Sequence, residues 1–128
     1  MIVKEEVIPL LLRACPSFKP VLDKWINDED YTPSVYLDLG EFARHIVYLY
    51  QNSKTDEFLP VFNVIECLHI EGDHYVKEAV TIGLLETLQN NALSEKVDLN
   101  VFLAYLGPVS REYWDKVIKF WETGEIIK

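Results

Sequence analysis

Apolar residues recur at intervals of three and four positions through nearly the whole chain, which is the spacing of one face of an α-helix. No segment alternates apolar and polar residues over the length of a strand, and no Asn-Gly or Asp-Gly pair marks a hairpin turn. The pattern therefore predicts an all-α protein. The predicted helices span residues 2–14, 18–27, 35–51, 56–70, 74–90, 99–106 and 111–123.

The connections between these helices are short, and short connections favour antiparallel neighbours. We therefore expect a single domain, residues 1–128, built as a bundle of about six or seven helices in antiparallel hairpins. Residues that commonly cap helix N-termini precede most of the helices: Ser17, Ser34, Thr55, Asp73 and Asp98. Pro9 predicts a kink in the first helix, while Gly107 with Pro108 predicts a left-handed end to the sixth.

The fifth predicted helix has small residues, Ala79 and Gly83, on the stripe that we expect to be buried. An interior glycine costs a helix about 1 kcal/mol relative to alanine, and close approach of another backbone is the simplest reason to keep one. The run "GDHYVKEAVTIGLLETL" resembles one HEAT unit, with an Asp before the helix and Ala and Gly-Leu on successive turns. No second clean copy is present, so we expect HEAT-like (α-α superhelix) packing by analogy, without a demonstrated array.

Three segments carry a wider likeness: "LGEFARHIV" (39–47), "EGDHYVKEA" (71–79) and "IGLLETLQN" (82–90). Together they resemble a family of small acidic bacterial proteins that share a domain of unknown function. The resemblance covers residues 34–90 well and the two ends weakly. It implies a shared fold and a bacterial cytosolic protein, and it suggests the company of contact-dependent toxin and immunity systems. It implies no catalytic residues.

The chain has 21 acidic and 12 basic residues, a net charge of −9, and no basic run. Nucleic-acid binding depends on phosphate neutralisation by Lys and Arg, so the charge disfavours nucleic acids and anionic membrane surfaces as partners. The N-terminal segment lacks the features of a signal peptide and no apolar run is long enough to span a bilayer, which indicates a cytoplasmic protein. We therefore expect both cysteines, Cys15 and Cys67, to be reduced and buried.

The stretch "CLHIEGDHYVKEA" (67–79) raises the question of a metal or acid–base site, because it contains His69 and His74 just after Glu66. Helical zinc sites often place two histidines four residues apart on one face. Here they are five apart and Gly72 interrupts the helix between them. We interpret the stretch as a joint between helices, with His69 partly buried and His74 at the surface. A shared site remains the alternative, if the turn folds the two rings together.

The segment "GEFARH" (40–45) allows Glu41 to pair with Arg44 or with His45 on the solvent face of a helix. An enzyme would need a base, a nucleophile and an oxyanion donor in one pocket, and the sequence offers no such set and no glycine-rich phosphate loop. We therefore predict no catalytic residue and no cofactor. The alternative is a metal-dependent or acid–base enzyme whose residues converge from three successive helices: Glu41, His45, Glu66, His69 and His74.

Two features favour contact with a protein partner. Asp28, Glu29 and Asp30 form an acidic run without the spacing or the glycine of a calcium loop, so a basic partner is the better interpretation. Tyr113 and Phe120 lie on one stripe of the last helix, and exposed aromatic residues anchor protein interfaces. The neighbouring stripe should face the core with four residues: Trp114, Val117, Ile118 and Trp121.

Helical hairpins, acidic charge and many aromatic residues together favour a non-enzymatic cytosolic protein–protein interaction module. It would be immunity-like or an adaptor, and its partner would be basic. We expect no nucleic acid and no membrane among its partners. The sequence leaves open whether the chain is a monomer or a homodimer.

Overall fold

The structure is a computed structural model that describes residues 1–124 of the chain. Within this range the secondary structure is helical, apart from an isolated parallel bridge between Ile2 and Gly72. The predicted all-α bundle is thus confirmed. Its elements are α1 (Lys4–Ala14), α2 (Phe18–Ile26), α3 (Val35–Gln51), α4 (Phe58–Glu71), α5 (His74–Ala79), the π-helix η1 (Val80–Glu86), α6 (Thr87–Ser94), the 3-10 helix η2 (Leu99–Phe102) and α7 (Pro108–Thr123).

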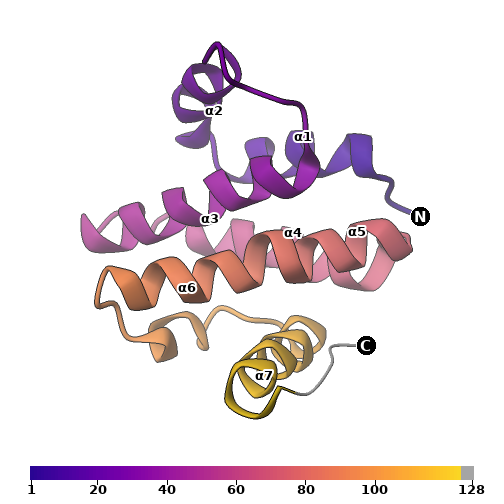
Figure 1. The fold of residues 1–128 in the computed structure, drawn as a ribbon, viewed down its shortest axis with the longest axis vertical. Helices are drawn as coiled ribbons and strands as arrows, with labels where there is room; N and C mark the ends of the chain where they lie inside the picture. Colours follow the sequence, from indigo (N-terminus) through magenta and orange to yellow (C-terminus); the bar gives the residue numbers. More distant parts are fainter. Residues whose placement is uncertain (125–128) are drawn as a thin grey trace.

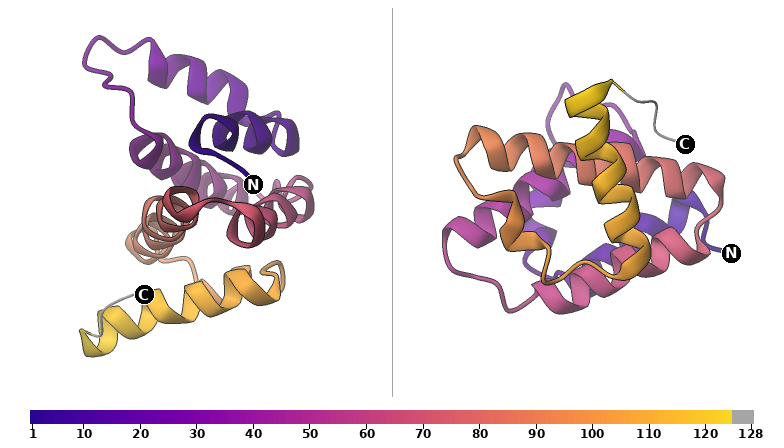
Figure 2. Two further views of the ribbon diagram at one scale, coloured as in Figure 1. Left: turned by 90° about the vertical axis from the view of Figure 1, so that its right-hand side faces the viewer. Right: turned by 90° about the horizontal axis from the view of Figure 1, so that it is seen from below.

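Helix α3 lies between two groups of helices. It packs against η1 and α6 on one side and against α1 and α2 on the other. Helix α2 stands at one end of the molecule and α7 at the opposite end, as Figure 1 shows. Helix α4 contacts both α1 and α7, and α7 crosses over the long α5–η1–α6 helix in the right-hand view of Figure 2. Surface residues on α2 and on α7 therefore belong to different ends of the protein.

Aromatic side chains fill the core between α4, η2 and α7. Phe58, Phe62 and Phe102 are fully or almost fully buried, and Trp114 is 1% exposed. The ring of Phe102 stacks on Phe62 with centroids 6.3 Å apart and meets Trp114 edge-on at 6.2 Å. Burying one such ring contributes roughly 1.5–3 kcal/mol, so η2 is held by the side chain that it inserts and needs little length of its own.

The predicted fifth helix is longer than expected and has a π-helical middle. It runs without a break from His74 to Ser94 through α5, η1 and α6. A Cβ at Gly83 would lie 3.2 Å from the carbonyl oxygen of Tyr36 and 3.3 Å from its Cα. The predicted close approach of another backbone at Gly83 is therefore confirmed, and the neighbour is the first turn of α3.

Three of the predicted N-caps are confirmed. Ser34 accepts from the N–H of Leu37, Asp73 accepts from the N–H of Val76, and Asp98 accepts from the N–H of Asn100. Ser17 is the N-cap residue of α2, as predicted, but its side chain makes no capping bond. The predicted cap at Thr55 is wrong, because the N-cap of α4 is Glu57.

The predictions around the sixth helix are also wrong. A helix over residues 99–106 is reduced to the four residues of η2. Gly107 has extended backbone angles, φ −73° and ψ 169°, and precedes α7 instead of ending a helix. Pro108 is the first residue of α7, a position where its missing N–H costs nothing and its fixed φ suits the helix. The seventh helix ends at Gly124, as predicted, in the left-handed conformation.

The first residues of the chain bind the joint between α4 and α5. The N–H of Ile2 donates to the carbonyl of Glu71 at 2.8 Å, and the N–H of Asp73 donates to the carbonyl of Ile2 at 2.9 Å. Gly72 lies between these two bonds with no space for a side chain. A Cβ there would overlap the carbonyl oxygen of Leu68 and lie 2.5 Å from Cγ1 of Val76.

This crowding predicts that Gly72→Ala lowers the free energy of unfolding by about 1–3 kcal/mol, because backbone at the joint must move to admit the methyl group. Gly40→Ala is the matched control, since the nearest atom to its added Cβ, in Arg44, is 3.7 Å away. It should be neutral or stabilising by up to about 1 kcal/mol through helix propensity. Urea unfolding followed by circular dichroism measures both, and equal stability of the two variants would contradict the prediction.

Candidate functional site

The two histidines of the α4–α5 joint point to different environments. His69 is 2% exposed, whereas the side chain of His74 is 96% exposed and lies 3.7 Å from Glu78. The two rings therefore do not face each other. Glu66 lies on α4 beside His69, but within residues 1–124 no group of three or more His, Cys, Asp or Glu side chains is arranged to hold a metal ion.

His69 bridges two elements inside the protein. Its Nδ1 lies 2.7 Å from Oγ of Ser110 on α7, and its Nε2 lies 3.3 Å from Oγ1 of Thr81 in η1. The Thr81 hydroxyl donates its proton to the carbonyl of Lys77 at 2.8 Å, so it accepts from the ring. This hydrogen-bond accounting assigns the proton of a neutral His69 to Nε2 and leaves Nδ1 to accept from Ser110.

Glu66 caps the start of α7 from a different helix. Its carboxylate accepts from the N–H of Ser110 at 2.8 Å and from the N–H of Val109 at 3.0 Å. These are the second and third positions of α7, whose N–H groups lack partners inside the helix. Burial alone would raise the pKa of Glu66, but the two N–H bonds outweigh it and the pKa lies below its usual value.

The surroundings of His69 fit a structural role. Burial lowers its pKa to about 4, the charge of Lys77 adds to the decrease, and Glu66 opposes it. The ring stacks on Tyr113 with centroids 4.7 Å apart. Ser110 is fully buried, and its bond to His69 joins α7 to α4, while the bond from His69 to Thr81 joins α4 to η1.

A second cluster joins α2, α3 and α4, and sequence reasoning missed it. The Ser17 hydroxyl contacts the Glu57 carboxylate closely and lies 2.9 Å from Nε2 of His45. The Ser17 N–H and the Cys15 thiol also donate to Glu57, at 3.3 Å and 3.6 Å. These partners are 28 to 42 residues apart, and no local pattern indicates such contacts.

The predicted pairing of Glu41 with His45 on the solvent face is wrong, because His45 is only 6% exposed and its ring turns toward Ser17. Burial lowers the pKa of His45, against the opposing charges of Glu57 and Glu41. Burial also raises the pKa of the Cys15 thiol to about 11, and the charge of Glu57 adds to that increase. With Ser17 donating to Glu57 and Cys15 protonated, neither side chain is activated as a nucleophile.

An open pocket of about 420 Å³ lies between α2 and α3. Five residues line it: Val21, Lys24, Trp25, Asp28 and Glu41. The Trp25 indole N–H donates to Asp38 at 3.0 Å, and the same carboxylate oxygen accepts from the Tyr31 hydroxyl at 3.1 Å. The Trp25 ring, which forms the aromatic wall of the pocket, is thus held in place by its hydrogen bond to Asp38.

A guanidinium group of the protein itself lies beside this wall. The Arg44 guanidinium lies 5.9 Å from the Trp25 ring centroid, within cation–π range, and 3.2 Å from the Glu41 carboxylate. The Arg44 side chain is 44% exposed. The predicted pairing of Glu41 with Arg44 is confirmed, and the indole completes a site that suits a cation.

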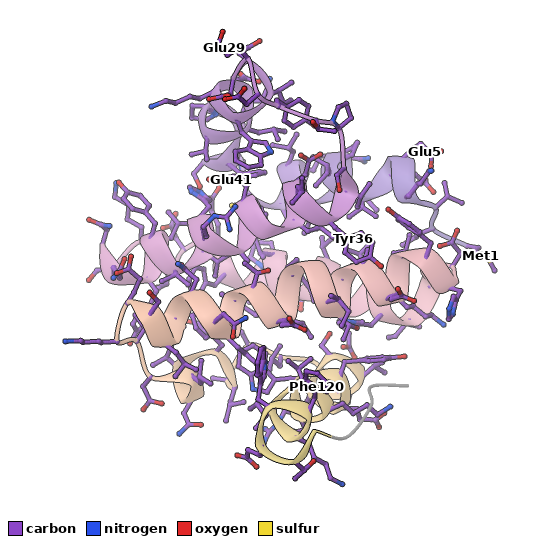
Figure 3. The ribbon with its side chains drawn as sticks, viewed as in Figure 1. Met1, Glu5, Glu29, Tyr36, Glu41 and Phe120 are labelled. Atoms are coloured by element: carbon purple, nitrogen blue, oxygen red, sulfur yellow. The ribbon has the colours of Figure 1, made fainter. Side chains whose placement is uncertain are left out.

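The acidic run lies directly beyond the pocket. Asp28, Glu29 and Asp30 are all exposed in the turn that follows α2. The Asp28 carboxylate accepts from the N–H of Asp30 at 2.8 Å, which shapes the turn. Figure 3 shows Glu29 at the tip of this end, above Glu41 on α3. None of the three acids forms an ion pair in the part of the chain that the structure describes.

The predicted aromatic contacts on α7 lie at the other end of the molecule, where Figure 3 labels Phe120. Tyr113 is half-buried against His69, and Phe120 packs edge-on against Trp121. The expectation that Trp121 faces the core is wrong, because it is 55% exposed and lines a shallow groove with Leu93. The structure therefore does not bring the acidic run and the α7 aromatics onto one surface.

Comparison with protein families gives one match, to a family model that covers residues 8–122, nearly the whole chain. The chain belongs to this family, which is described as a domain of unknown function (DUF7674). The matched range includes both histidine clusters and the α2–α3 pocket. Comparisons with curated proteins and with solved structures found no match. No helix within residues 1–124 combines the length and the apolar content needed to cross a bilayer.

The buried neutral His69 predicts acid-sensitive stability. Its pKa is about 4 in the folded protein and near 6.5 when unfolded, so the unfolded state binds more protons between these values. The contribution of His69 to the free energy of unfolding is therefore constant above pH about 6.5. It falls by a total on the order of 3 kcal/mol as the pH decreases from about 6.5 to about 4. Urea unfolding across this window should show reduced pH dependence in His69→Gln. The matched variant His74→Gln should keep the native dependence, and an unchanged slope in His69→Gln would contradict the assignment.

The two cysteines should differ sharply in reactivity. Both are free, but Cys15 is buried, while the expectation that Cys67 is buried is wrong, because it is exposed on α4. A thiol-specific reagent near neutral pH should therefore modify Cys67 at once and Cys15 only after denaturation. Cys67→Ser should abolish the fast reaction and Cys15→Ser should preserve it. Fast modification of the Cys67→Ser variant in the absence of denaturant would show that the Cys15 cluster opens readily.

Proposed function

We propose that this protein is a non-enzymatic protein-binding domain that receives a basic partner on the end formed by α2, the following turn and α3. Residues 18–44 contain six acidic and three basic residues. The observation that carries the proposal is the α2–α3 pocket, which combines an indole wall with the carboxylates of Asp28 and Glu41. An immunity protein or an adaptor is the kind of protein that such a surface suits.

Electrostatics support a basic partner. Lys19 is paired with Asp23 at 2.6 Å and Arg44 with Glu41 at 3.2 Å, so two of the three bases in this segment are engaged locally. The acidic run beside the pocket forms no such ion pair in the described part of the chain. An uncompensated cluster of one sign attracts an oppositely charged protein and raises its association rate.

Trp25 supplies the second requirement of a protein interface, an aromatic anchor. Tryptophan is enriched among the residues that dominate binding energy, most of all where a pocket and a polar rim surround it. Trp25 lies in such a place, with its ring fixed by Asp38. Tyr113 and Phe120, at the opposite end, would serve a separate contact.

The enzymatic alternative has less support. It requires Glu41, His45, Glu66, His69 and His74 to converge on one site. Instead, the three histidines lie in three different environments. His45 belongs to the α2–α3–α4 cluster, His69 to the α4–η1–α7 cluster and His74 to the protein surface. Both buried histidines have lowered pKa values because of burial, and both are held by serine hydroxyls that face other protein groups.

The proposal is tested with a short unstructured peptide that carries several lysines and arginines, titrated by calorimetry at two salt concentrations. The native chain should bind it, more weakly at high salt. The triple variant Asp28→Asn/Glu29→Gln/Asp30→Asn should lose about tenfold in affinity, since it removes the charges nearest the pocket. Asn at position 28 keeps an oxygen that accepts from the N–H of Asp30.

A matched triple variant separates local from overall charge. Glu5→Gln/Glu95→Gln/Glu112→Gln removes the same number of negative charges from exposed sites outside this end. It should bind the peptide within about twofold of the native chain. Equal losses in the two triple variants would show that only net charge matters, and that outcome would overturn the assignment of the binding surface.

A further inference from the structure

We infer that the α2–α3 pocket is an arginine-binding site, in which an arginine of the partner stacks on Trp25 and pairs with Asp28 and Glu41. The inference rests on the proposed function and specifies the residue type that this surface recognises. Its basis is the position of Arg44, whose guanidinium contacts two of the residues that line the pocket, Trp25 and Glu41.

Arg44 makes the two kinds of contact that this surface can offer a guanidinium group, one to an aromatic face and one to a carboxylate. Its planar guanidinium approaches the face of the Trp25 indole at 5.9 Å and binds the Glu41 carboxylate at 3.2 Å. Guanidinium is weakly hydrated and stacks well on aromatic faces, whereas a lysine ammonium is a compact, strongly hydrated charge. The pocket wall therefore favours arginine over lysine at equal charge.

The pocket has space for a further side chain. Its volume of about 420 Å³ is open to solvent, and Asp28 lines it without forming an ion pair in the described chain. Lys24 also lines the pocket, but its side chain is exposed and its long stem allows the ammonium to turn into solvent. A second guanidinium can therefore meet the Asp28 carboxylate beside the indole.

Arg44 is also easy to displace. Its side chain is 44% exposed, and it pairs with Glu41 three residues earlier on the same helix. Such exposed pairs contribute little to stability. A partner's arginine can therefore replace or join Arg44 on Trp25 and Glu41, while the Trp25 ring keeps its hydrogen bond to Asp38.

Two peptides of identical sequence test the assignment, one with arginine and one with lysine at each basic position. The readout is the indole N–H signals in a nitrogen–proton correlation spectrum, with the Trp25 signal identified through Trp25→Phe. The arginine peptide should bind about three- to tenfold more tightly than its lysine twin. It should shift the Trp25 signal and leave that of Trp121, half-exposed at the other end, unchanged.

Two variants probe the pocket itself. Trp25→Leu should reduce the preference for the arginine peptide to less than about twofold, because the aromatic face on which a guanidinium stacks is gone. Arg44→Gln frees the Trp25 ring and the Glu41 carboxylate and should raise the affinity for the arginine peptide about threefold or more. Lys54→Gln removes the same positive charge outside the pocket and is the control for a purely electrostatic gain. An equal gain in Arg44→Gln and Lys54→Gln would contradict the role of Arg44.

The remaining outcomes separate this inference from the proposed function. Equal binding of the two peptides to the native chain would overturn arginine recognition and leave a basic partner in place. Failure of both peptides to bind would overturn both proposals. Free arginine should bind at least about tenfold more weakly than the peptide, because it cannot reach the acidic turn at the same time. Equal affinity of free arginine would overturn the assignment to a protein partner.

Discussion

The fold depends on a carboxylate of one helix that accepts hydrogen bonds from the first free N–H groups of another helix. The first turn of α7 begins with Pro108, which has no N–H, and the next two N–H groups donate to Glu66 of α4. Without that acceptor these donors would lack partners at a partly buried helix end, and an unpaired donor costs up to about 1–3 kcal/mol where it is shielded from water. Glu66 thereby fixes where α7 begins and how it meets α4, and the position of Ser110 against His69 follows from it.

The other end of α4 repeats this solution. Glu57, just before α4, accepts from the backbone and the hydroxyl of Ser17 and from the Cys15 thiol. In both clusters a glutamate of the α4 region binds a serine, and that serine also contacts a buried histidine from a nearby helix. Both histidines have lowered pKa values because burial disfavours their charged form, so both ties between helices favour the neutral ring.

The sequence pattern predicts helices well and contacts between distant residues poorly, for a physical reason. Periodicity and capping are local, so the helix over 35–51 and the caps at Ser34 and Asp73 are confirmed, and Gly83 correctly indicates a close backbone. The Ser17 hydroxyl could have capped α2 locally, but it binds the distant side chains of Glu57 and His45 instead. Residue spacing does not predict contacts between residues so far apart in the sequence, and it does not predict the α2–α3 pocket.

The error at Trp121 has a related cause. A regular stripe on α7 predicts a buried ring, but burial requires a neighbouring helix along the whole stripe. In Figure 2 the last turn of α7 extends beyond the α5–α6 helix, and Trp121 there is 55% exposed. The angle at which two helices cross determines how much of an apolar stripe is covered by the neighbouring helix. That angle cannot be derived from the pattern of one helix alone.

The same reasoning explains why the α2 end is suited to binding. The two clusters on α4 satisfy their own polar groups, and no buried side-chain nitrogen or oxygen among residues 1–124 lacks a hydrogen-bond partner. The acidic turn differs, because Asp28, Glu29 and Asp30 are adjacent, repel one another and form no ion pair within residues 1–124. A partner's cation would both attract these carboxylates and relieve their mutual repulsion. Since the Trp25 ring is already fixed by Asp38, little further ordering of the protein is needed to bind it, and more of the interaction energy is retained as affinity.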